Sequence, residues 1–173
     1  MSEKKVLGID TSSVSLNLAV VDEGGTAVSS YQEVSKNHAG RLPSVFDQVI
    51  PPSRTDLLSA VGVIAGPGSF TGLRVGLSAA LALRAALRIP VFQVSTLYAL
   101  ARSASPDGKG AVLIDARKGE FYIQFFEKLG GRTEPLSGPS TIKYGELESC
   151  IEGLDRALGA NLAAEERAMP PHL

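Results

Sequence analysis

The chain has 173 residues, of which 44% are hydrophobic and 20% are charged, and its formal net charge is −1. This composition is ordinary for a soluble globular protein of one domain or two small lobes, and it excludes a protein that binds nucleic acid through a large excess of basic charge. The single cysteine, Cys150, excludes an internal disulfide framework and indicates a reducing cytoplasm.

Three short strands are predicted at the start of the chain, at residues 5–9, 16–21 and 26–34. The first two are apolar runs and the third alternates between apolar and polar residues, as strands commonly do. A polar loop that begins at Asp10 and a turn at Gly24 separate them. The short connections favour an antiparallel meander.

A first helix is expected to begin near His38, because Pro43 is tolerated in a first helical turn and Pro51 ends the helical pattern. Five apolar residues recur along it at helical spacing. They are Leu42, Val45, Phe46, Val49 and Ile50. The segment is therefore predicted to be an amphipathic helix.

The next predicted unit is a strand, a turn, a long helix and a second strand. The apolar run 60–65 ends in a Gly-Pro-Gly turn at 66–68, and Ser69 is a good N-cap for a helix that continues until Pro90. Another apolar run, 91–94, follows that proline and is typical of a buried strand.

The long helix is apolar on two sides. One side carries mostly small side chains and is expected to lie against the sheet; it consists of Gly72, Val75, Gly76, Ala79, Ala82, Leu83 and Ala86. The second side consists of Leu73, Leu77, Ala80, Leu81 and Leu87, with Arg74, Arg84 and Arg88 at its borders. A helix that is apolar almost all round is buried on more than one side. The second side is therefore covered either by another polypeptide, as in a partner-binding helix, or by a neighbouring helix of the same domain.

The second half of the chain predicts a helix over 96–103, a turn-rich linker over 105–110, and strands over 111–114 and 121–126. Residues 133–142 are expected to be partly extended. A last amphipathic helix is predicted from five apolar residues at helical spacing. They are Leu147, Ile151, Leu154, Leu158 and Leu162.

The order of strand, Asp-led loop, strand, Gly-Gly turn and strand occurs twice, with Asp10 and Asp115 at corresponding places. This indicates a weak internal repeat. We therefore predict two related lobes, residues 1–104 and 105–173, of which the second is reduced.

The glycine-rich stretch 66–72 is not a known nucleotide motif. It lacks the Lys-Ser/Thr pair of a phosphate loop, and its glycine spacing differs from the dinucleotide fingerprint. A structural turn is favoured, although the helix N-terminus could hold an anion. Asp10, Thr11 and Ser12 could contact phosphate and metal, and the alternative is that their side chains cap a hairpin.

The sequence contains no convincing enzyme site. The histidines are His38, which fits a cap or an interface residue better than a base, and His172; with Cys150 they form no zinc set. The Gly-x-Ser-x-Gly nucleophile motif is absent, and residues 115–120 fit an ionic turn between strands. The alternatives that stay open are a small-molecule kinase or ATPase that uses the Asp10 loop, and a peptidase.

Five stretches together resemble the TsaB (YeaZ) family. They are residues 9–12, 38–42, 66–74, 89–91, and 115–120 with Tyr122. The resemblance runs in order from Val6 to about Leu147, and the string Gly-Pro-Gly-Ser-Phe-Thr-Gly-Leu-Arg is its most specific part. It implies an α/β fold of the actin-like, sugar-kinase type (ribonuclease H-like), with a mixed sheet flanked by helices and a second lobe that is truncated at its C-terminus.

The resemblance also implies a role in tRNA modification in the bacterial cytoplasm. A member of this family pairs with TsaD and recruits the ATPase TsaE, and together they transfer threonylcarbamoyl to the adenosine beside the anticodon of tRNAs that read codons beginning with A. The family member is then a non-catalytic scaffold without metal or cofactor, with ATP only at the junction with its partners. It contacts tRNA only indirectly and does not enter the membrane.

The partner surface implied by the resemblance comes from the first two helices. It comprises His38, Arg41, Leu42, Val45, Phe46, Val49, Phe70, Leu73, Arg74 and Leu77. The same helices can form a homodimer when TsaD is absent, and Asp10, Thr11 and Ser12 become a vestigial nucleotide loop. The family is also grouped with supposed glycoproteases, a label that the missing metal-ligand histidines argue against here.

Overall fold

The computed structural model describes residues 4–104 and 107–160, which divide into two compact units, Met1–Ser95 (unit 1) and Thr96–Leu173 (unit 2). This division lies nine residues before the boundary predicted from the sequence at 104. The reason is that helix α3 (Thr96–Ser103) packs on strands of unit 2, with Leu97 and Ala101 in an apolar cluster of that unit.

Unit 1 contains the predicted succession of three strands, a helix, a strand, a long helix and a strand. Its elements are β1 (Lys5–Asp10), β2 (Ser15–Val21), β3 (Ala27–Val34), α1 (His38–Val49), η1 (Pro52–Leu57), β4 (Leu58–Gly66), α2 (Phe70–Leu87) and β5 (Val91–Ser95). The sheet order is β3-β2-β1-β4-β5. Because β1, β2 and β3 are antiparallel while β4 and β5 run parallel to β1, the sheet is mixed.

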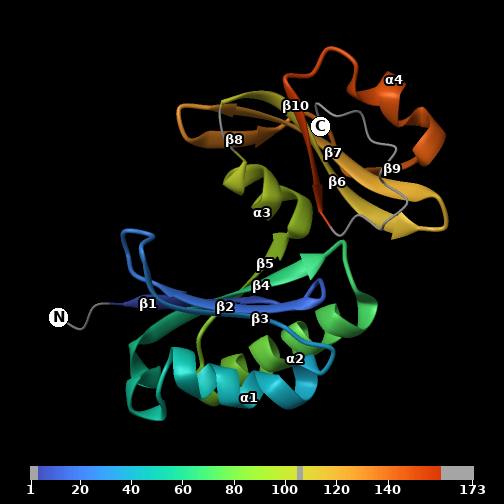
Figure 1. The fold of residues 1–173 in the computed structure, drawn as a ribbon. Coiled ribbons are helices and arrows are strands. Elements are labelled where there is room, and N and C mark those ends of the chain that lie inside the picture. Colours follow the sequence, from blue (N-terminus) through green and yellow to red (C-terminus); the bar gives the residue numbers. More distant parts are fainter. Residues whose placement is uncertain (1–3, 105–106, 161–173) are drawn as a thin grey trace. The chain divides into compact units, whose positions relative to one another are not determined.

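Helices α1 and α2 cover the same face of this sheet (Figure 1). Along β1, Leu7 and Ile9 point to this face and are buried, and the alternate residues Gly8 and Asp10 belong to the opposite face. The helices therefore bury one face of the sheet in a single apolar core.

Unit 2 repeats the strand connections of unit 1. Its strands and remaining helices are β6 (Gly108–Arg117), β7 (Glu120–Leu129), β8 (Arg132–Pro135), β9 (Ser140–Lys143), η2 (Tyr144–Glu146), α4 (Leu147–Ile151) and β10 (Arg156–Ala160). β6 pairs antiparallel with β7 and parallel with β10, as β1 pairs with β2 and β4. Helices α3 and α4 pack in two separate apolar clusters of the unit.

The predicted last helix is wrong beyond Ile151. Gly153 has a positive φ of 77° just after α4, and Leu158 lies in strand β10, where it pairs with Val112 of β6. The helical spacing of the leucines did not decide the structure of this segment. Its backbone N–H and C=O groups are hydrogen-bonded instead through pairing with a strand that is distant in the sequence. Leu162 lies outside the described residues.

Candidate functional site

The glycine-rich turn brings helix α2 against the loop that follows β1. A Cβ on Gly72 would collide with the carbonyl oxygen of Thr11, and a Cβ on Gly76 would collide with the Thr11 hydroxyl. A Cβ on Gly68 would lie 2.6 Å from the carbonyl oxygen of Ser12. The glycines are thus needed for the close approach of this turn and of α2 to the loop after β1, which supports a structural turn at this motif.

Thr11 and Ser12 are buried beneath α2, each only 2% exposed. The Thr11 hydroxyl donates to the carbonyl oxygen of Gly72 at 2.8 Å, and the Ser69 amide donates to the carbonyl oxygen of Ser12 at 2.6 Å. Ser69 in turn accepts the Gly72 amide as the N-cap of α2. These two members of the candidate nucleotide loop therefore join the loop to the helix, and their side chains are not available to a ligand.

The third member of that loop, Asp10, lies on the face of the sheet opposite α1 and α2. One carboxylate oxygen accepts the Ser12 amide at 2.8 Å and the Ser12 hydroxyl at 2.7 Å. Asp10 borders a hollow on this face, together with Asn17, Gly8 and Gly62. Asp10 is therefore the one residue of the predicted loop that a small molecule in this hollow could reach.

Asp115 does not repeat the position of Asp10. Its carboxylate accepts the Tyr144 hydroxyl at 2.9 Å and the Arg117 amide at 2.6 Å, and it lies on the α4 side of its sheet. The helix of unit 1 that corresponds to α4 is α1, since α1 precedes β4 as α4 precedes β10. Asp10 points away from α1. The predicted equivalence of Asp10 and Asp115 is therefore wrong, because alternation places the two carboxylates on different faces. Within residues 4–104 and 107–160, no three His, Cys, Asp or Glu side chains are grouped to hold a metal ion.

The segment 115–120 forms the turn between β6 and β7, as predicted. Arg117 and Lys118 have positive φ angles of 64° and 57°, and Gly119 follows at 82°. The Asp115 carboxylate holds the Arg117 amide in this turn.

Arg41 attaches the start of α1 to strand β3. Its guanidinium donates to both carboxylate oxygens of Glu33, at 2.8 and 3.0 Å, and to the Tyr31 hydroxyl at 3.1 Å. Hydrogen bonds from Arg41 and then from Tyr31 lower the pKa of Glu33, and Glu33 in turn raises the pKa of Arg41. Arg41, which was expected on a partner surface, has a side chain that is 42% exposed, and its hydrogen bonds join α1 to β3.

The apolar stripe of α1 belongs to the core of unit 1. Leu42, Val45 and Val49 are buried, with Val45 fully enclosed, and Phe46 is partly buried against them. The expectation that Val45 and Val49 lie on a partner surface is therefore wrong, because this stripe is the one that covers the sheet, whereas Leu42 also borders an open groove beside α2. His38 is half-exposed, with its Nε2 3.4 Å from the Val14 carbonyl oxygen.

Helix α2 is rotated relative to the predicted faces. Gly72, Gly76 and Ala80, four residues apart, form its buried line, so Ala80 belongs to the sheet side, whereas Ala82 and Ala86 are exposed. The cause is the contact with Thr11, because only the side of the helix that carries Gly72 and Gly76 leaves room for this close approach. Of the predicted second side, Leu73, Leu77 and Leu87 are half-buried, and Leu81 is 47% exposed.

Six of the ten exposed residues of α2 and its C-cap define a surface that is here called the outer face. At 100° per residue these positions fall on one side of the helix. They are Phe70, Arg74, Leu81, Arg84, Ala85 and Arg88. Phe70 is 74% exposed, and the Arg74 guanidinium lies over its ring, 5.5 Å from the centroid. An open groove, which Leu42 and Pro43 of α1 line on one side, runs beside Arg74.

The 18 residues of α2 have a mean hydropathy of 1.3, enough by length and composition alone to cross a membrane. The glycine line nevertheless packs on β1 and β4, and three arginines lie on the outer face. The helix is thus a sheet-covering element with an uncovered apolar side.

Comparison with known proteins gives a match to one family model and to curated relatives with a different name. Residues 27–167 match the family model described as "TsaD: tRNA N6-adenosine threonylcarbamoyltransferase". The TsaB protein of Bacillus subtilis, named for tRNA threonylcarbamoyladenosine biosynthesis, is 31% identical over 157 residues, which is 87% of this chain. The alignments with three curated TsaB relatives cover 67%, 55% and 74% of those proteins, so the chain spans only part of their length.

Two solved structures show the same fold. YeaZ from Pseudomonas aeruginosa has a TM-score of 0.77 at 24% identity, over 91% of this chain and 84% of that one. A Bacteroides thetaiotaomicron protein with an actin-like ATPase fold and unknown function has a TM-score of 0.53 at 13% identity, over 97% and 86% of the two chains. The predicted actin-like α/β fold is thereby confirmed.

Proposed function

The chain belongs to the TsaB (YeaZ) family, and we propose that it serves tRNA threonylcarbamoyladenosine biosynthesis as a non-catalytic scaffold that binds TsaD through the outer face of α2. In this proposal TsaD carries out the transfer of the threonylcarbamoyl group to tRNA. The complex of the two proteins then recruits TsaE, and tRNA is contacted only through the partners.

The exposure of Phe70 is the observation that carries this proposal. A large aromatic side chain that is 74% exposed on a helix leaves apolar surface in water, and burying a Phe side chain is worth about 1.5–3 kcal/mol. Aromatic residues and arginines are also the residues that contribute most to binding at protein interfaces. Phe70, Arg74 and Leu81 on one helix face therefore fit a docking surface.

The non-catalytic part of the proposal is supported by the loop after β1. The hydroxyls of Thr11 and Ser12 are both used in internal hydrogen bonds, and the Asp10 carboxylate accepts two of its own loop's donors. Because these side chains are already hydrogen-bonded within the protein, the loop offers few groups to a nucleotide. We propose that the protein needs no cofactor of its own and that ATP binds, if at all, at the junction with partner subunits.

Two further parts of the proposal concern the protein without TsaD. The outer face would then be covered by a second copy, which gives a homodimer, since the same apolar surface is exposed on each chain. The location proposed for the protein is the cytoplasm, where tRNA modification takes place.

A second candidate function is a small-molecule kinase or ATPase. The observation in its favour is the hollow on the face of the sheet opposite α1 and α2, where Asp10 and Asn17 present polar groups beside Gly8 and Gly62. Isothermal titration with Mg-ATP distinguishes the two candidates. Tight binding with turnover by the isolated protein would support the kinase and contradict the scaffold.

Co-purification with tagged TsaD tests the scaffold directly. We expect wild-type protein to co-purify, and Phe70→Glu and Leu81→Glu to lose TsaD while keeping the fold, because both side chains are exposed. Leu129→Glu is the matched control, since Leu129 is 73% exposed on unit 2. Retention of TsaD by both α2 variants would refute this docking face.

A further inference from the structure

Acidic residues are absent from a long part of the sequence around α2. All 18 Asp and Glu residues of the chain lie outside residues 57–106, which contain four arginines and no lysine. Three of these arginines, Arg74, Arg84 and Arg88, are on α2 or at its C-cap. A chain with almost balanced charge overall thus has a local excess of positive charge at one helix.

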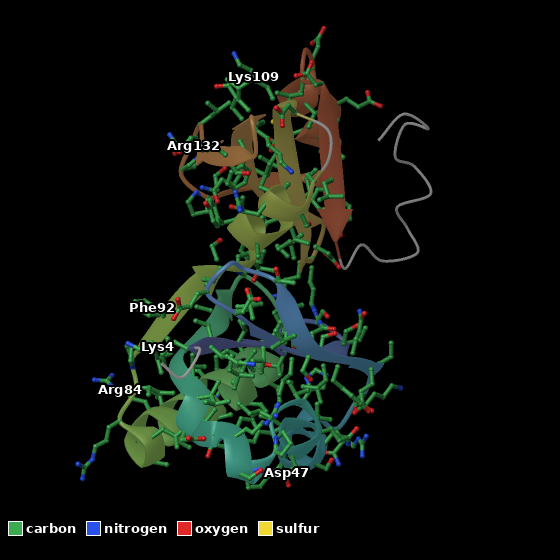
Figure 2. All side chains as sticks on the ribbon, turned by 90° about the vertical axis from the view of Figure 1, so that its left-hand side faces the viewer. Lys4, Asp47, Arg84, Phe92, Lys109 and Arg132 are labelled. Carbon is green, nitrogen blue, oxygen red and sulfur yellow. The ribbon has the colours of Figure 1, made fainter. Side chains whose placement is uncertain are left out.

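The three arginines lie on the outer face, interleaved with apolar side chains. Arg74 follows Phe70 by one helical turn, Leu81 and Ala85 come next, and Arg88 closes the helix. With a rise of 1.5 Å per residue, Arg74 and Arg88 are about 21 Å apart along the axis. Figure 2 shows the Arg84 side chain directed outward from unit 1.

None of these guanidinium groups has a carboxylate partner among the described residues. The ion pair found within that part of the chain joins Arg41 to Glu33, whereas Arg74 contacts the ring of Phe70. The nearby helix α1 carries one acidic residue, Asp47. The outer face therefore has positive charge that its own unit does not neutralise.

Resting on the proposed function, we infer that the protein surface which docks on the outer face of α2 has an apolar centre edged by carboxylates. Arginine pairs with carboxylates in a planar, two-bonded geometry, and complementary charge speeds the encounter of two proteins. The apolar residues between the arginines favour a protein partner, since nucleic acid is held by denser basic charge along its phosphates. Leu73 and Leu77 beside this face are half-buried, Leu77 against the core of unit 1, and the surface that they leave exposed adds to its apolar centre.

Association kinetics with purified TsaD, over a range of salt concentrations, test this inference. We expect the wild-type association rate to fall as salt rises, and Arg74→Glu/Arg84→Glu to associate about tenfold more slowly at low salt, with a flatter salt dependence. Arg74→Lys/Arg84→Lys keeps the charge and should keep most of the salt dependence. Arg54→Glu on η1 and Arg132→Glu on β8 are matched controls, because both arginines are exposed outside the outer face. Circular dichroism verifies that each variant is folded.

The outcomes separate the two proposals. Absence of wild-type binding to TsaD would refute the proposed function and this inference together. Binding that is unchanged in rate and salt dependence by Arg74→Glu/Arg84→Glu would overturn this inference alone. Binding of tRNA or of anionic lipid vesicles that the substitutions abolish, with TsaD binding intact, would also overturn it.

Discussion

The contact between Thr11 and the glycine line of α2 leads to a prediction that distinguishes two neighbouring glycines. Alanine in place of glycine inside a helix normally stabilises by about 1 kcal/mol. At both Gly72 and Gly76, however, a methyl group would collide with an atom of Thr11. Overpacking of this kind costs about 1–3 kcal/mol.

The two collisions differ in the atom that obstructs the methyl group. At Gly72 it is the Thr11 carbonyl oxygen, which belongs to the backbone and cannot rotate away, so we expect Gly72→Ala to lower the free energy of unfolding by about 2 kcal/mol. At Gly76 it is the Thr11 hydroxyl, and the net loss should be about 1 kcal/mol. Thr11→Ala alone should cost about 1 kcal/mol, through the lost hydrogen bond to the Gly72 carbonyl oxygen.

A double-mutant cycle measured by urea unfolding separates these contributions. In the Thr11→Ala background, Gly76→Ala should become neutral or stabilising, because the obstructing hydroxyl is gone. Gly72→Ala should keep its full cost, because the carbonyl oxygen remains, and it is therefore the matched control. If Gly76→Ala stabilises the wild-type protein, or if Thr11→Ala rescues both glycine variants equally, the packing described here is wrong.

Three further predictions follow from single positions. Arg88 has a φ of 55° at the C-cap of α2, so Arg88→Gly should raise the free energy of unfolding by about 0.5–1 kcal/mol in thermal denaturation, and no gain would contradict the cap geometry. The pKa of Glu33 is lowered from 4.5 by its hydrogen bonds, so the stability that Glu33 contributes is present above pH 4.5 and is lost as the pH falls through the lowered value. The difference in the free energy of unfolding between wild type and Glu33→Gln should therefore shrink over that range. A difference that stays constant with pH would contradict this prediction. Val45→Ala should cost about 2 kcal/mol and Leu81→Ala less than about 0.5 kcal/mol, and equal costs in urea unfolding would show that the two helix faces were misassigned.

The elements of unit 1 were predictable because their signals are local. Ser69 caps α2 with its own hydroxyl, and the glycine-rich turn before it ends β4, so the start of the helix at Phe70 follows from neighbouring residues. The alternating and apolar runs of β1 to β3 likewise predicted the meander. The resemblance to the TsaB family depended on the same local strings.

The errors came from contacts between residues far apart in the sequence. Leu158 has helical spacing relative to Ile151, but pairing with Val112 of β6 makes its segment a strand. The rotation of α2 depends on Thr11, whose hydroxyl meets the Gly72 carbonyl oxygen across 61 positions of the chain. No local pattern contains either contact.

By itself, the sequence determined where most helices and strands of unit 1 begin and end, which family the chain belongs to, and that α2 has more apolar surface than one contact can bury. Only the tertiary structure decided that Val45 is core while Phe70 and Leu81 are exposed, and that Thr11 and Ser12 support the helix. The physical reason is that caps and periodicity act between near neighbours, whereas the side of a helix that is buried depends on the strand on which it packs.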